Sequence, residues 1–399
     1  MDSLPSIRFE PDALPEGCAW IGSSASTKPQ AVLNPWQDPT QKLDLLLLLA
    51  ATRTAEQEGI SAAGSTAISR RYTALADAEL LLRGPSQPRR WPLPPLPAGV
   101  SPALLSHVAV RDLSLSTSVA ALGLVKAPDF GHLRLESPDQ GPAECLSTGA
   151  AMPLQRVQHL WCQGERIGSR LRRPLVLAEC VPGGTTTAQA VLTALKISVD
   201  TLISGSARQP PHGLKRKLVA AGLKRARLGR AASVLDVLAA VGDPFQAVGA
   251  GLLVGAVRSG QPVLLGGGSQ MLAVLALALE GLPHPLRSVL ADQVLIGTTA
   301  WLAEEGGRPP HQSAALDQVV RNVAERFELS LHALASGLRF HTSAQQCLRD
   351  YECGYVKEGV GAGALLLLAQ LRGRTLQQLV ADCDSAAEQL QPRAVTSEL

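Results

Sequence analysis

The sequence predicts an α/β fold in which helices cover both faces of a mostly parallel sheet. Short apolar runs alternate with longer helical patterns, which is typical of strand–helix repeats. The runs are almost continuously apolar, as expected for strands that are buried on both faces. We expect one large α/β body at 40–340, with a smaller, mainly helical part built from the terminal segments 1–39 and 341–399.

The individual elements follow from these patterns, taken in chain order. The apolar runs predict buried strands at Leu43–Ala51, Ala78–Leu82, Pro174–Ala178, Pro262–Leu265 and Gln293–Ile296. Helical patterns occupy Thr186–Leu195, Ala247–Val257, Gln270–Leu279, Ala362–Leu371 and about Thr375–Leu390. Two proline-containing stretches, Gly84–Pro102 and Ser204–Gly213, predict loops, because proline disfavours both a helix interior and a central strand.

Composition excludes several classes of protein. Apolar residues make up 46% of the 399 residues and charged residues 18%, which is enough for a large folded core. Aromatic residues make up only 3%, fewer than a binder that stacks bases or sugars normally has. The formal net charge of +3 is too small for a surface that binds polyanions along the whole chain. We therefore expect no nucleic-acid partner.

The cysteines and the apolar runs predict a cytoplasmic protein. The seven cysteines are an odd number and contain no C-x-x-C pair, which favours a reducing compartment. Residues 1–5 lack the basic and then apolar order of a signal peptide. The longest apolar run, Leu45–Ala51, is far shorter than the ~20 residues of a membrane helix. The eight histidines lack metal-ligand spacing, and His341, Cys347 and Cys353 are the nearest approach to a cluster, so we expect neither a metal nor a cofactor.

The strongest local motif is a strand that ends at Glu179 and is followed by Pro182, Gly183 and Gly184 and then by threonines that open a helix. Glycine lets a ligand approach the backbone closely, and the free N–H groups of a helix N-terminus attract anions. Ligands of open α/β sheets bind at the carboxyl ends of the strands. The motif therefore favours phosphate or sugar binding over an ordinary turn with a threonine cap.

Two further motifs repeat this pattern. Gly266, Gly267, Gly268 and Ser269 lie between a predicted strand and an apolar helix, where they could bind an anion or simply allow close packing. Glu358 lies among glycines just before another apolar helix, where it is either a general base or a charge that favours the helix dipole. The candidate substrate-binding residues of the three motifs are Gly183, Gly184, Thr185, Thr186, Gly266, Gly267, Gly268, Ser269, Lys357, Gly359 and Gly361.

A basic stretch from Lys215 to Arg230 predicts either a solvated helix face or a rim that attracts a phosphorylated substrate. The motifs G-x-x-x-x-G-K-[ST], G-x-G-x-x-G after a strand and G-x-S-x-G are all missing. The sequence thus gives no support for P-loop nucleotide hydrolysis, a nicotinamide dehydrogenase or a hydrolase elbow.

At these residues the chain resembles the nicotinate-nucleotide–dimethylbenzimidazole phosphoribosyltransferases, and in particular a less characterised branch of that family. The resemblance spans about Leu43 to Leu371 and is carried by Glu56–Gly64, Glu179–Ala188, Gly242–Gln246, Pro262–Met271 and Lys357–Gly363. It implies a Rossmann-like three-layer domain with a small helical domain, usually in a homodimer. It also implies a reaction in the assembly of the cobamide lower ligand. In that reaction, ribose-phosphate moves from nicotinate mononucleotide to a ring nitrogen of an aromatic base.

The resemblance also implies roles for the motif residues. Glu358 matches the general base, and Glu179 matches a second acidic residue on the ribose side. A carboxylate near the sugar can stabilise the positive charge that develops as the C–N bond breaks. Gly183 to Thr185 match the loop near the phosphate, and Gly266 to Ser269 match a second wall of the pocket. The family needs no metal for this chemistry.

The chain departs from the well-known members at two places. Gly184 stands where they carry Asn, and Ala55–Gly59 stands where they carry Asp-His-Gly, so the acceptor base does not follow from the resemblance. Dimethylbenzimidazole, another benzimidazole and adenine all stay open. Two other functions also stay open: a transferase that uses phosphoribosyl pyrophosphate, and a non-catalytic module that senses nucleotides. The former normally has two adjacent acids, whereas Glu179 is followed by Cys180.

Overall fold

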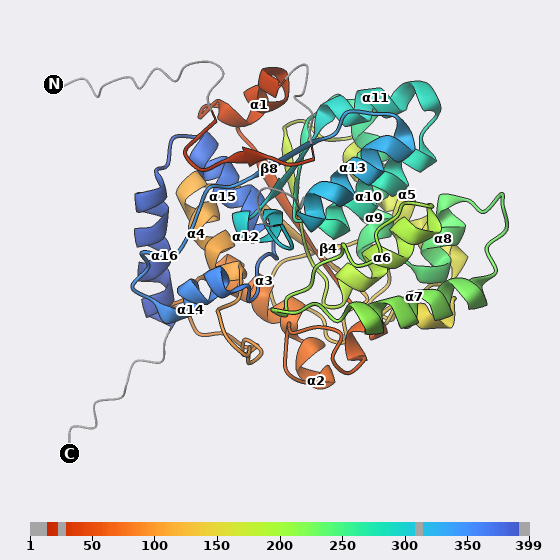
Figure 1. The fold of residues 1–399 in the computed structure, drawn as a ribbon, viewed down its shortest axis with the longest axis horizontal. Coiled ribbons are helices and arrows are strands. Elements are labelled where there is room, and N and C mark those ends of the chain that lie inside the picture. Colours follow the sequence, from red (N-terminus) through yellow and green to blue (C-terminus); the bar gives the residue numbers. More distant parts are fainter. Residues whose placement is uncertain (1–13, 23–28, 308–313, 391–399) are drawn as a thin grey trace.

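The computed structural model describes residues 14–22, 29–307 and 314–390 (Figure 1). Residues 1–5, on which the expectation of no signal peptide rests, lie outside the described residues, as do the outer ends of both terminal segments. The described chain forms an eight-stranded sheet in the order β1-β8-β7-β6-β5-β2-β3-β4. Its strands are β1 (Ala19–Trp20), β2 (Asp44–Ala50), β3 (Ser116–Leu122), β4 (Leu133–Arg134), β5 (Leu175–Cys180), β6 (Val263–Gly266), β7 (Val294–Thr298) and β8 (His332–Ala335).

All neighbouring strands pair in parallel except β1, which pairs antiparallel with β8. The mostly parallel α/β sheet is therefore confirmed. Strand β2 shows why its sequence is continuously apolar. Leu45, Leu47 and Leu49 belong to one hydrophobic core, whereas Leu46 and Leu48 belong to another. Because successive side chains of a strand point to opposite faces, the sheet separates two cores.

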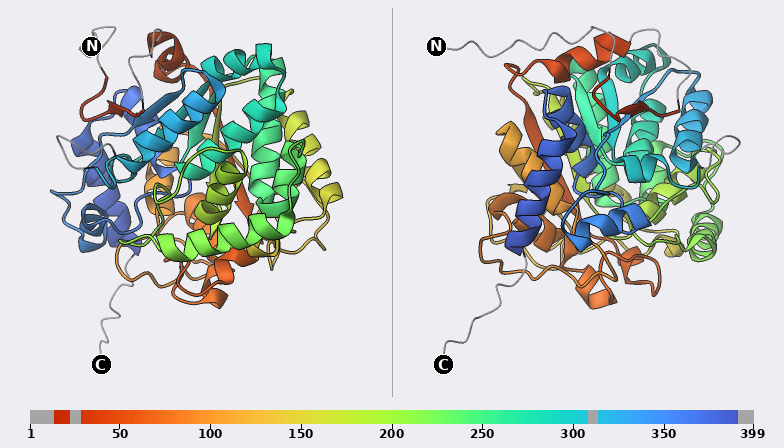
Figure 2. Two further views of the ribbon diagram at one scale, coloured as in Figure 1. Left: turned by 45° about the vertical axis from the view of Figure 1, so that its right-hand side comes forward. Right: turned by 60° about the vertical axis from the view of Figure 1, so that its left-hand side comes forward.

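Helices cover both faces of the sheet and give three layers (Figures 1 and 2). The core that contains Leu45 is completed by helices from the N-terminal third and from the C-terminal end of the chain. These helices are α1 (Pro29–Gln37), α3 (Thr73–Arg83), α4 (Ala103–Leu113), α15 (Ala362–Leu371) and α16 (Leu376–Leu390). The opposite core contains helices from the middle of the chain. They are α5 (Leu154–Gly168), α6 (Gly184–Ala194), α7 (His212–Ala226), α8 (Val234–Val241), α9 (Pro244–Ser259), α10 (Ser269–Gly281), α11 (His284–Gln293) and α13 (Ala315–Phe327).

Six short segments complete the described secondary structure. Three are helices, α2 (Ala67–Arg70), α12 (Ala300–Ala303) and α14 (Gln346–Arg349), and three are 3-10 turns, η1 (Arg53–Glu56), η2 (Leu146–Thr148) and η3 (Asp350–Cys353). The strand expected at Ala78–Leu82 is wrong, because these residues belong to helix α3. No helix within the described ranges is both long and apolar enough to span a membrane.

Helices α5 and α9 pack against each other through glycines. A Cβ at Gly164 would lie 2.1 Å from the carbonyl oxygen of Val248, and one at Gly251 would lie 2.2 Å from that of Trp161. Real Cβ atoms do not approach other atoms so closely, so the two backbones touch only because these positions have no side chain.

The strand order creates the crevice that holds the site. From β2 the chain moves to β3 on one side, whereas β5 to β8 follow one another on the other side. The order therefore reverses between β2 and β5. Open α/β sheets bind ligands at such a point, outside the carboxyl ends of the strands.

Candidate functional site

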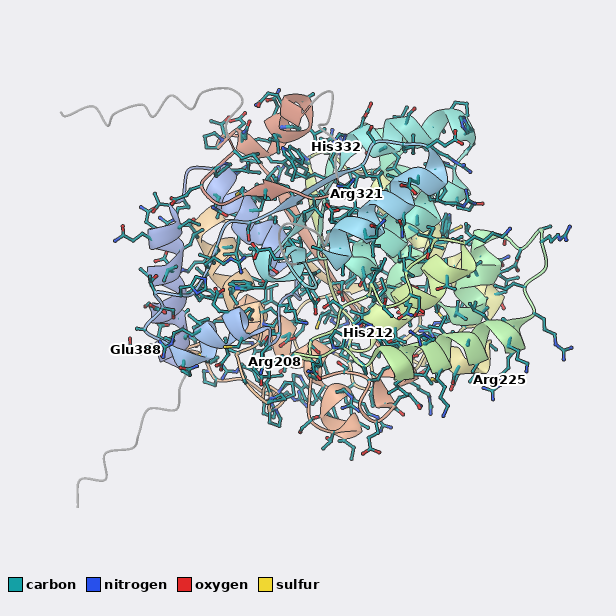
Figure 3. All side chains as sticks on the ribbon, viewed as in Figure 1. Arg208, His212, Arg225, Arg321, His332 and Glu388 are labelled. Atoms are coloured by element: carbon teal, nitrogen blue, oxygen red, sulfur yellow. The ribbon has the colours of Figure 1, made fainter. Side chains whose placement is uncertain are left out.

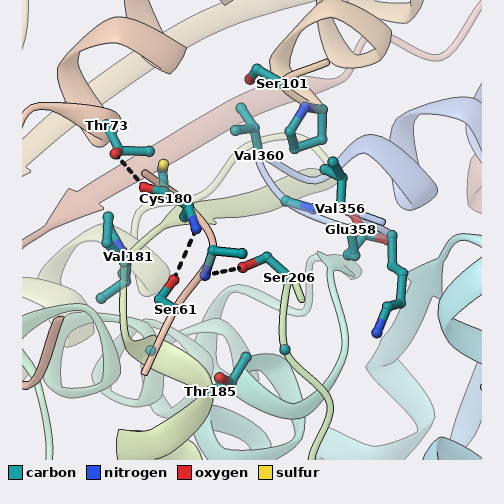
Figure 4. Close-up of a pocket in the computed structure, with 18 of the residues that line it drawn as sticks. Ser61, Thr73, Ser101, Cys180, Val181, Thr185, Ser206, Val356, Glu358 and Val360 are labelled. Carbon is teal, nitrogen blue, oxygen red and sulfur yellow. Dashed lines mark hydrogen bonds between the residues drawn. The ribbon is translucent and has the colours of Figure 1, made fainter. Parts of the chain in front are cut away.

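A cavity opens at the carboxyl end of β5 (Figure 4). Loops from distant parts of the chain meet there, in agreement with the reversal of strand order. Most of the lining comes from residues 60–63, 93–94, 96–98, 101–102, 179–185, 204–206, 268–270 and 355–360. The cavity therefore brings together segments of all three motifs that the sequence singled out.

Glu179 lies at the mouth of β5 and lines the cavity. The turn after it is built on Gly183, which has a φ of +81° and caps helix α6. A Cβ on Gly183 would meet the backbone N of Ala55 at 2.9 Å, so this position needs glycine for its conformation and for space. Burial raises the pKa of Glu179 to about 8, and the nearby Asp243 carboxyl adds to this shift. Near neutral pH, Glu179 therefore holds a proton easily, and a positive charge beside it would lower its pKa and favour the carboxylate.

Glu358 also lines the cavity, and four donors hold its carboxylate. Oε2 accepts hydrogen bonds from Thr298 Oγ1 and Thr299 N, both at 3.0 Å. Oε1 accepts from Gly359 N at 3.0 Å and from Gly363 N at 3.2 Å. Burial raises the pKa of Glu358 and these donors oppose that rise. Since a carboxylate has about four acceptor positions, every one of them is used within the protein.

The glycines of the second and third motifs divide into two groups. Gly268 and Ser269 line the cavity, as does Gly359. Gly266 and Gly361 lie behind the lining and contact each other, since a Cβ on Gly266 would be 2.9 Å from the Cα of Gly361. This contact brings the start of α15 against the sheet and so fixes the loop that carries Glu358. Gly267 and Thr186 also lie outside the lining, whereas Gly183, Gly184, Thr185 and Lys357 are part of it.

Two buried lysines lie on the Thr185 side of the site. Lys215 is 0% exposed, and its Nζ donates to Thr185 Oγ1 at 3.0 Å and to the carbonyl oxygens of Ile203 and Ser204. Burial lowers the pKa of Lys215 to about 7. Lys357 pairs with Glu305, with 2.5 Å between Nζ and Oε1.

The basic stretch therefore has two environments. Lys215 is turned inward behind Thr185, whereas Arg225 on the same helix α7 is exposed and lies at the outer edge of the molecule (Figure 3). A lysine with no carboxylate hydrogen-bonded to it in the described chain thus lies directly behind Thr185, outside the lining of the cavity. An anionic ligand placed at Thr185 would favour its charged form.

Known proteins resemble the chain along its whole length. It is 63% identical over 400 residues to a UPF0284 protein of Parasynechococcus marenigrum, an alignment that covers 99% of this chain and 100% of the relative. A UPF0284 protein of Prochlorococcus marinus is 56% identical, with 98% of both chains covered. The chain belongs to the UPF0284 family. A family model described as phosphoribosyltransferase matches residues 107–283.

Two solved structures share the fold of this UPF0284 protein. One is a nicotinate-nucleotide–dimethylbenzimidazole phosphoribosyltransferase from Thermus thermophilus, with a TM-score of 0.53, 17% identity and coverage of 91% of this chain and 89% of that one. The other is CobT from the same organism, with a TM-score of 0.55, 18% identity and 92% coverage of both chains. The family model, which matches part of the chain, and the fold shared with these two structures agree with the resemblance that the sequence carries.

The candidate site residues named from the sequence leave out three parts of the cavity lining, although the first of them lies in the Glu56–Gly64 segment that carries the resemblance. Residues 60–63 and 204–206 line the cavity, and Ala62 N donates to Ser206 Oγ at 3.1 Å, so the two loops meet over it. Asp77 also lines the cavity, from the helix that was expected to be a strand. The aspartate between apolar neighbours was the one available signal. Within the described chain, no group of three or more His, Cys, Asp or Glu side chains is arranged to hold a metal ion.

Proposed function

We propose that this UPF0284 protein transfers the phosphoribosyl group of nicotinate mononucleotide to a ring nitrogen of an aromatic base, as a step of cobamide lower-ligand assembly. One observation carries the proposal: Glu179 and Glu358 line the same cavity, together with the first residues of helices α6 and α10. The site thus offers two carboxylates for a developing cation and two helix N-termini for a phosphate.

The phosphate is assigned to the Thr185 side. Gly184 and Thr185 begin α6, where the helix dipole and free N–H groups favour an anion. The Lys215 ammonium donates to the Thr185 hydroxyl, and in the described chain no carboxylate is hydrogen-bonded to it, although Glu305 acts on it from a longer distance. Ser269 begins α10 on the neighbouring wall of the cavity. These groups supply donors and positive charge, which a dianionic phosphate requires.

The reaction then follows from charge development at the sugar. The bond between C1 of the ribose and the pyridinium nitrogen breaks, and nicotinate leaves with the bonding pair. The cationic pyridinium ring of the bound nucleotide favours the ionised form of Glu179, whose pKa burial otherwise raises to about 8. The resulting carboxylate stabilises the positive charge that grows on the ribose. The lone pair of the acceptor nitrogen forms the new bond to C1, and the acceptor loses its N–H proton. Holding both partners in line supplies much of the rate.

Glu358 is proposed to receive that proton. Its four acceptor positions are occupied, so one donor must release it first. The Thr298 hydroxyl can do so by rotating about its C–O bond, whereas the backbone N–H groups are fixed. Proton transfer to Glu358 is therefore coupled to a rotation of Thr298, and the remaining three donors keep the carboxylate in place.

The proposal is tested with purified protein, nicotinate mononucleotide and a panel of benzimidazoles and purines, with nicotinate release followed by chromatography. Release that requires both an acceptor and Glu179 supports the transferase. Tight binding of the nucleotide without turnover for any acceptor would instead identify a nucleotide-sensing module. Turnover with phosphoribosyl pyrophosphate alone would identify the other transferase class. Analytical ultracentrifugation tests the homodimer that we propose with this function.

A further inference from the structure

The side of the cavity away from Thr185 contains a buried carboxylate that the proposed reaction does not use. Asp77 is 5% exposed and projects from helix α3 into the lining. Its Oδ1 accepts a hydrogen bond from Ser101 Oγ at 2.6 Å, and its Oδ2 accepts one from Cys180 Sγ at 3.4 Å. Ser101 and Cys180 line the same cavity, and Figure 4 places Ser101 across it from Thr185.

The Asp77 carboxylate has unused acceptor capacity. Its two hydrogen bonds occupy about half of the four acceptor positions of a carboxylate. None of the ion pairs in the described chain involves Asp77, so no lysine or arginine balances its charge there. Burial raises its pKa to about 6, and the two donors oppose that rise. Burial also keeps the Cys180 thiol protonated, by raising its pKa well above the usual range, so that the thiol can only donate to Asp77.

The cavity also has apolar walls. Leu93, Pro94, Leu96 and Pro97 line it from the proline-containing loop, which leads to the Asp77 partner Ser101, and Val360 lines it from the loop after Glu358. Proline has a fixed φ and a rigid ring, so it can form a wall that needs little ordering when a flat ligand enters.

Contacts at both ends hold this loop in place. Glu79 accepts hydrogen bonds from Arg90 N and Trp91 N, both at 2.9 Å, and the Trp91 ring stacks on Tyr72 with 5.3 Å between centroids. At the other end, Tyr351 donates its hydroxyl proton to the carbonyl oxygen of Val100 at 2.8 Å. The apolar wall is therefore formed before any ligand binds.

We propose that this part of the cavity is the acceptor subsite, and that Asp77 selects a nitrogen heterocycle which presents an exocyclic amino group to its carboxylate. The assignment rests on the proposed function. The donor nucleotide fits this end poorly, because the carboxylate of its nicotinate ring would face the Asp77 carboxylate in an apolar setting. A heterocycle with an amino group instead supplies the missing donor, while its rings contact the leucine and proline wall. A base with only methyl groups at that edge leaves the carboxylate desolvated and without a partner.

The preference for an amino compound over its methyl analogue should be as large as the contribution of one hydrogen bond to the Asp77 carboxylate. A hydrogen bond to a charged group contributes enough to change binding by roughly 10- to 100-fold, and sites built around a hydrogen bond discriminate strongly against analogues that lack it. We expect wild-type protein to use adenine at least roughly 10-fold better, in kcat/KM, than 6-methylpurine, in which a methyl group replaces the amino group. The same direction is expected for 5-aminobenzimidazole against 5-methylbenzimidazole.

The test compares the two acceptors of each pair within one protein preparation, so that the fraction of folded protein cancels from the ratio. Asp77→Leu is expected to lose the preference for the amino compound or to reverse it. Ser101→Ala leaves the carboxylate but removes one of the groups that orient it, and a smaller loss of preference is expected. Asp292→Asn is the control, because Asp292 is exposed on α11 and does not line the cavity. A wild-type protein that uses both acceptors equally on both scaffolds would overturn the assignment.

Calorimetry of the free bases separates this inference from the proposed reaction. If no acceptor gives nicotinate release, but adenine still binds wild type more tightly than 6-methylpurine and Asp77→Leu removes the difference, the reaction fails and the subsite stands. If release occurs with the same acceptor ratio in wild type and Asp77→Leu, the reaction stands and the role of Asp77 is refuted. If neither base binds, the acceptor subsite is refuted as well.

Discussion

Replacement of Glu358 by glutamine should lower the stability of the protein as well as its turnover rate. The carboxylate accepts two hydrogen bonds on each oxygen, from Thr298 and Thr299 on one side and from Gly359 and Gly363 on the other. A glutamine amide has one oxygen and one NH₂ group, so one pair of donors must face another donor. Turned toward Gly359 and Gly363, the NH₂ group would meet two backbone N–H groups. Turned toward Thr298, it would meet only one, because the hydroxyl can rotate to accept.

The second orientation is the less unfavourable one, and the expected magnitude is worked from it. The substitution leaves the Thr299 N–H without its partner and removes the charge from three other hydrogen bonds. An unsatisfied buried donor costs about 1–3 kcal/mol, and hydrogen bonds to a charged group contribute more than neutral ones. We therefore expect Glu358→Gln to lower the free energy of unfolding by about 2–4 kcal/mol. Thr298→Val removes a single donor and should lower it by about 1 kcal/mol.

Urea unfolding followed by circular dichroism measures both values. Glu388→Gln is the control, because Glu388 is exposed at the outer surface of α16 (Figure 3). If Glu358→Gln unfolds at the same urea concentration as wild type and as this control, the carboxylate does not anchor the loop and the hydrogen-bond reasoning is refuted. If stability is lost as expected, a fall in turnover must be measured under conditions where the variant stays folded. A decrease of roughly 10²–10⁴-fold in kcat under those conditions is the range of a positioned acid or base.

Three further predictions follow from the structure. The Glu179 carboxyl has a pKa of about 8 in the folded protein and near 4.5 in the unfolded chain, so between these values only the folded protein keeps the proton. The free energy of unfolding should therefore fall as pH rises through this window. Urea titrations at several pH values measure this fall, and Glu179→Gln should remove it. Lys215→Met should weaken the binding of nicotinate mononucleotide roughly 10-fold or more, as measured by calorimetry, whereas Lys217→Met, at an exposed position, should not. The affinity of the wild-type protein should also decline as pH rises above about 7, because Lys215 then loses its charge. Gly251→Ala should lower the free energy of unfolding by roughly 1–3 kcal/mol, because its Cβ would meet the Trp161 carbonyl oxygen at 2.2 Å. Gly213→Ala is the control and should be neutral or slightly stabilising, because nothing lies within 4 Å of the added Cβ. Equal effects of the two variants would contradict the close packing of α5 against α9.

The sequence predicted the layers of the fold well, because periodicity reports directly on burial. The continuous apolar run of β2 and the exact match of the expected helix Ala362–Leu371 with α15 both depend on local pattern. The strand expected at Ala78–Leu82 failed because a run of five apolar and acidic residues cannot distinguish a strand from a buried helix. In the structure, both acids of this helix are buried, and three of their partners, Ser101, Arg90 and Trp91, come from the next loop.

The site was predictable in its loops and unpredictable in its contacts. Glycines beside Glu179 and Glu358 identified two walls of the cavity, since glycine and a helix start are local signals. The donors to Glu358 from Thr298 and Thr299 lie some sixty residues earlier in the chain, and no local pattern connects them. The inward position of Lys215 was hidden for the same reason, because its exposed neighbours have the same charge and only tertiary contacts distinguish it.

Strand β1 covers an edge of the sheet that strand β8 would otherwise form. It pairs with β8 through Ala19–Trp20, and Gln370 holds the preceding residues by donating to the carbonyl oxygen of Glu16 at 3.0 Å. Without this segment, β8 would present unpaired N–H and C=O groups to solvent, and such groups template the addition of strands from other molecules. A shortened version that starts at residue 29 should consequently form soluble aggregates on storage, which light scattering would detect.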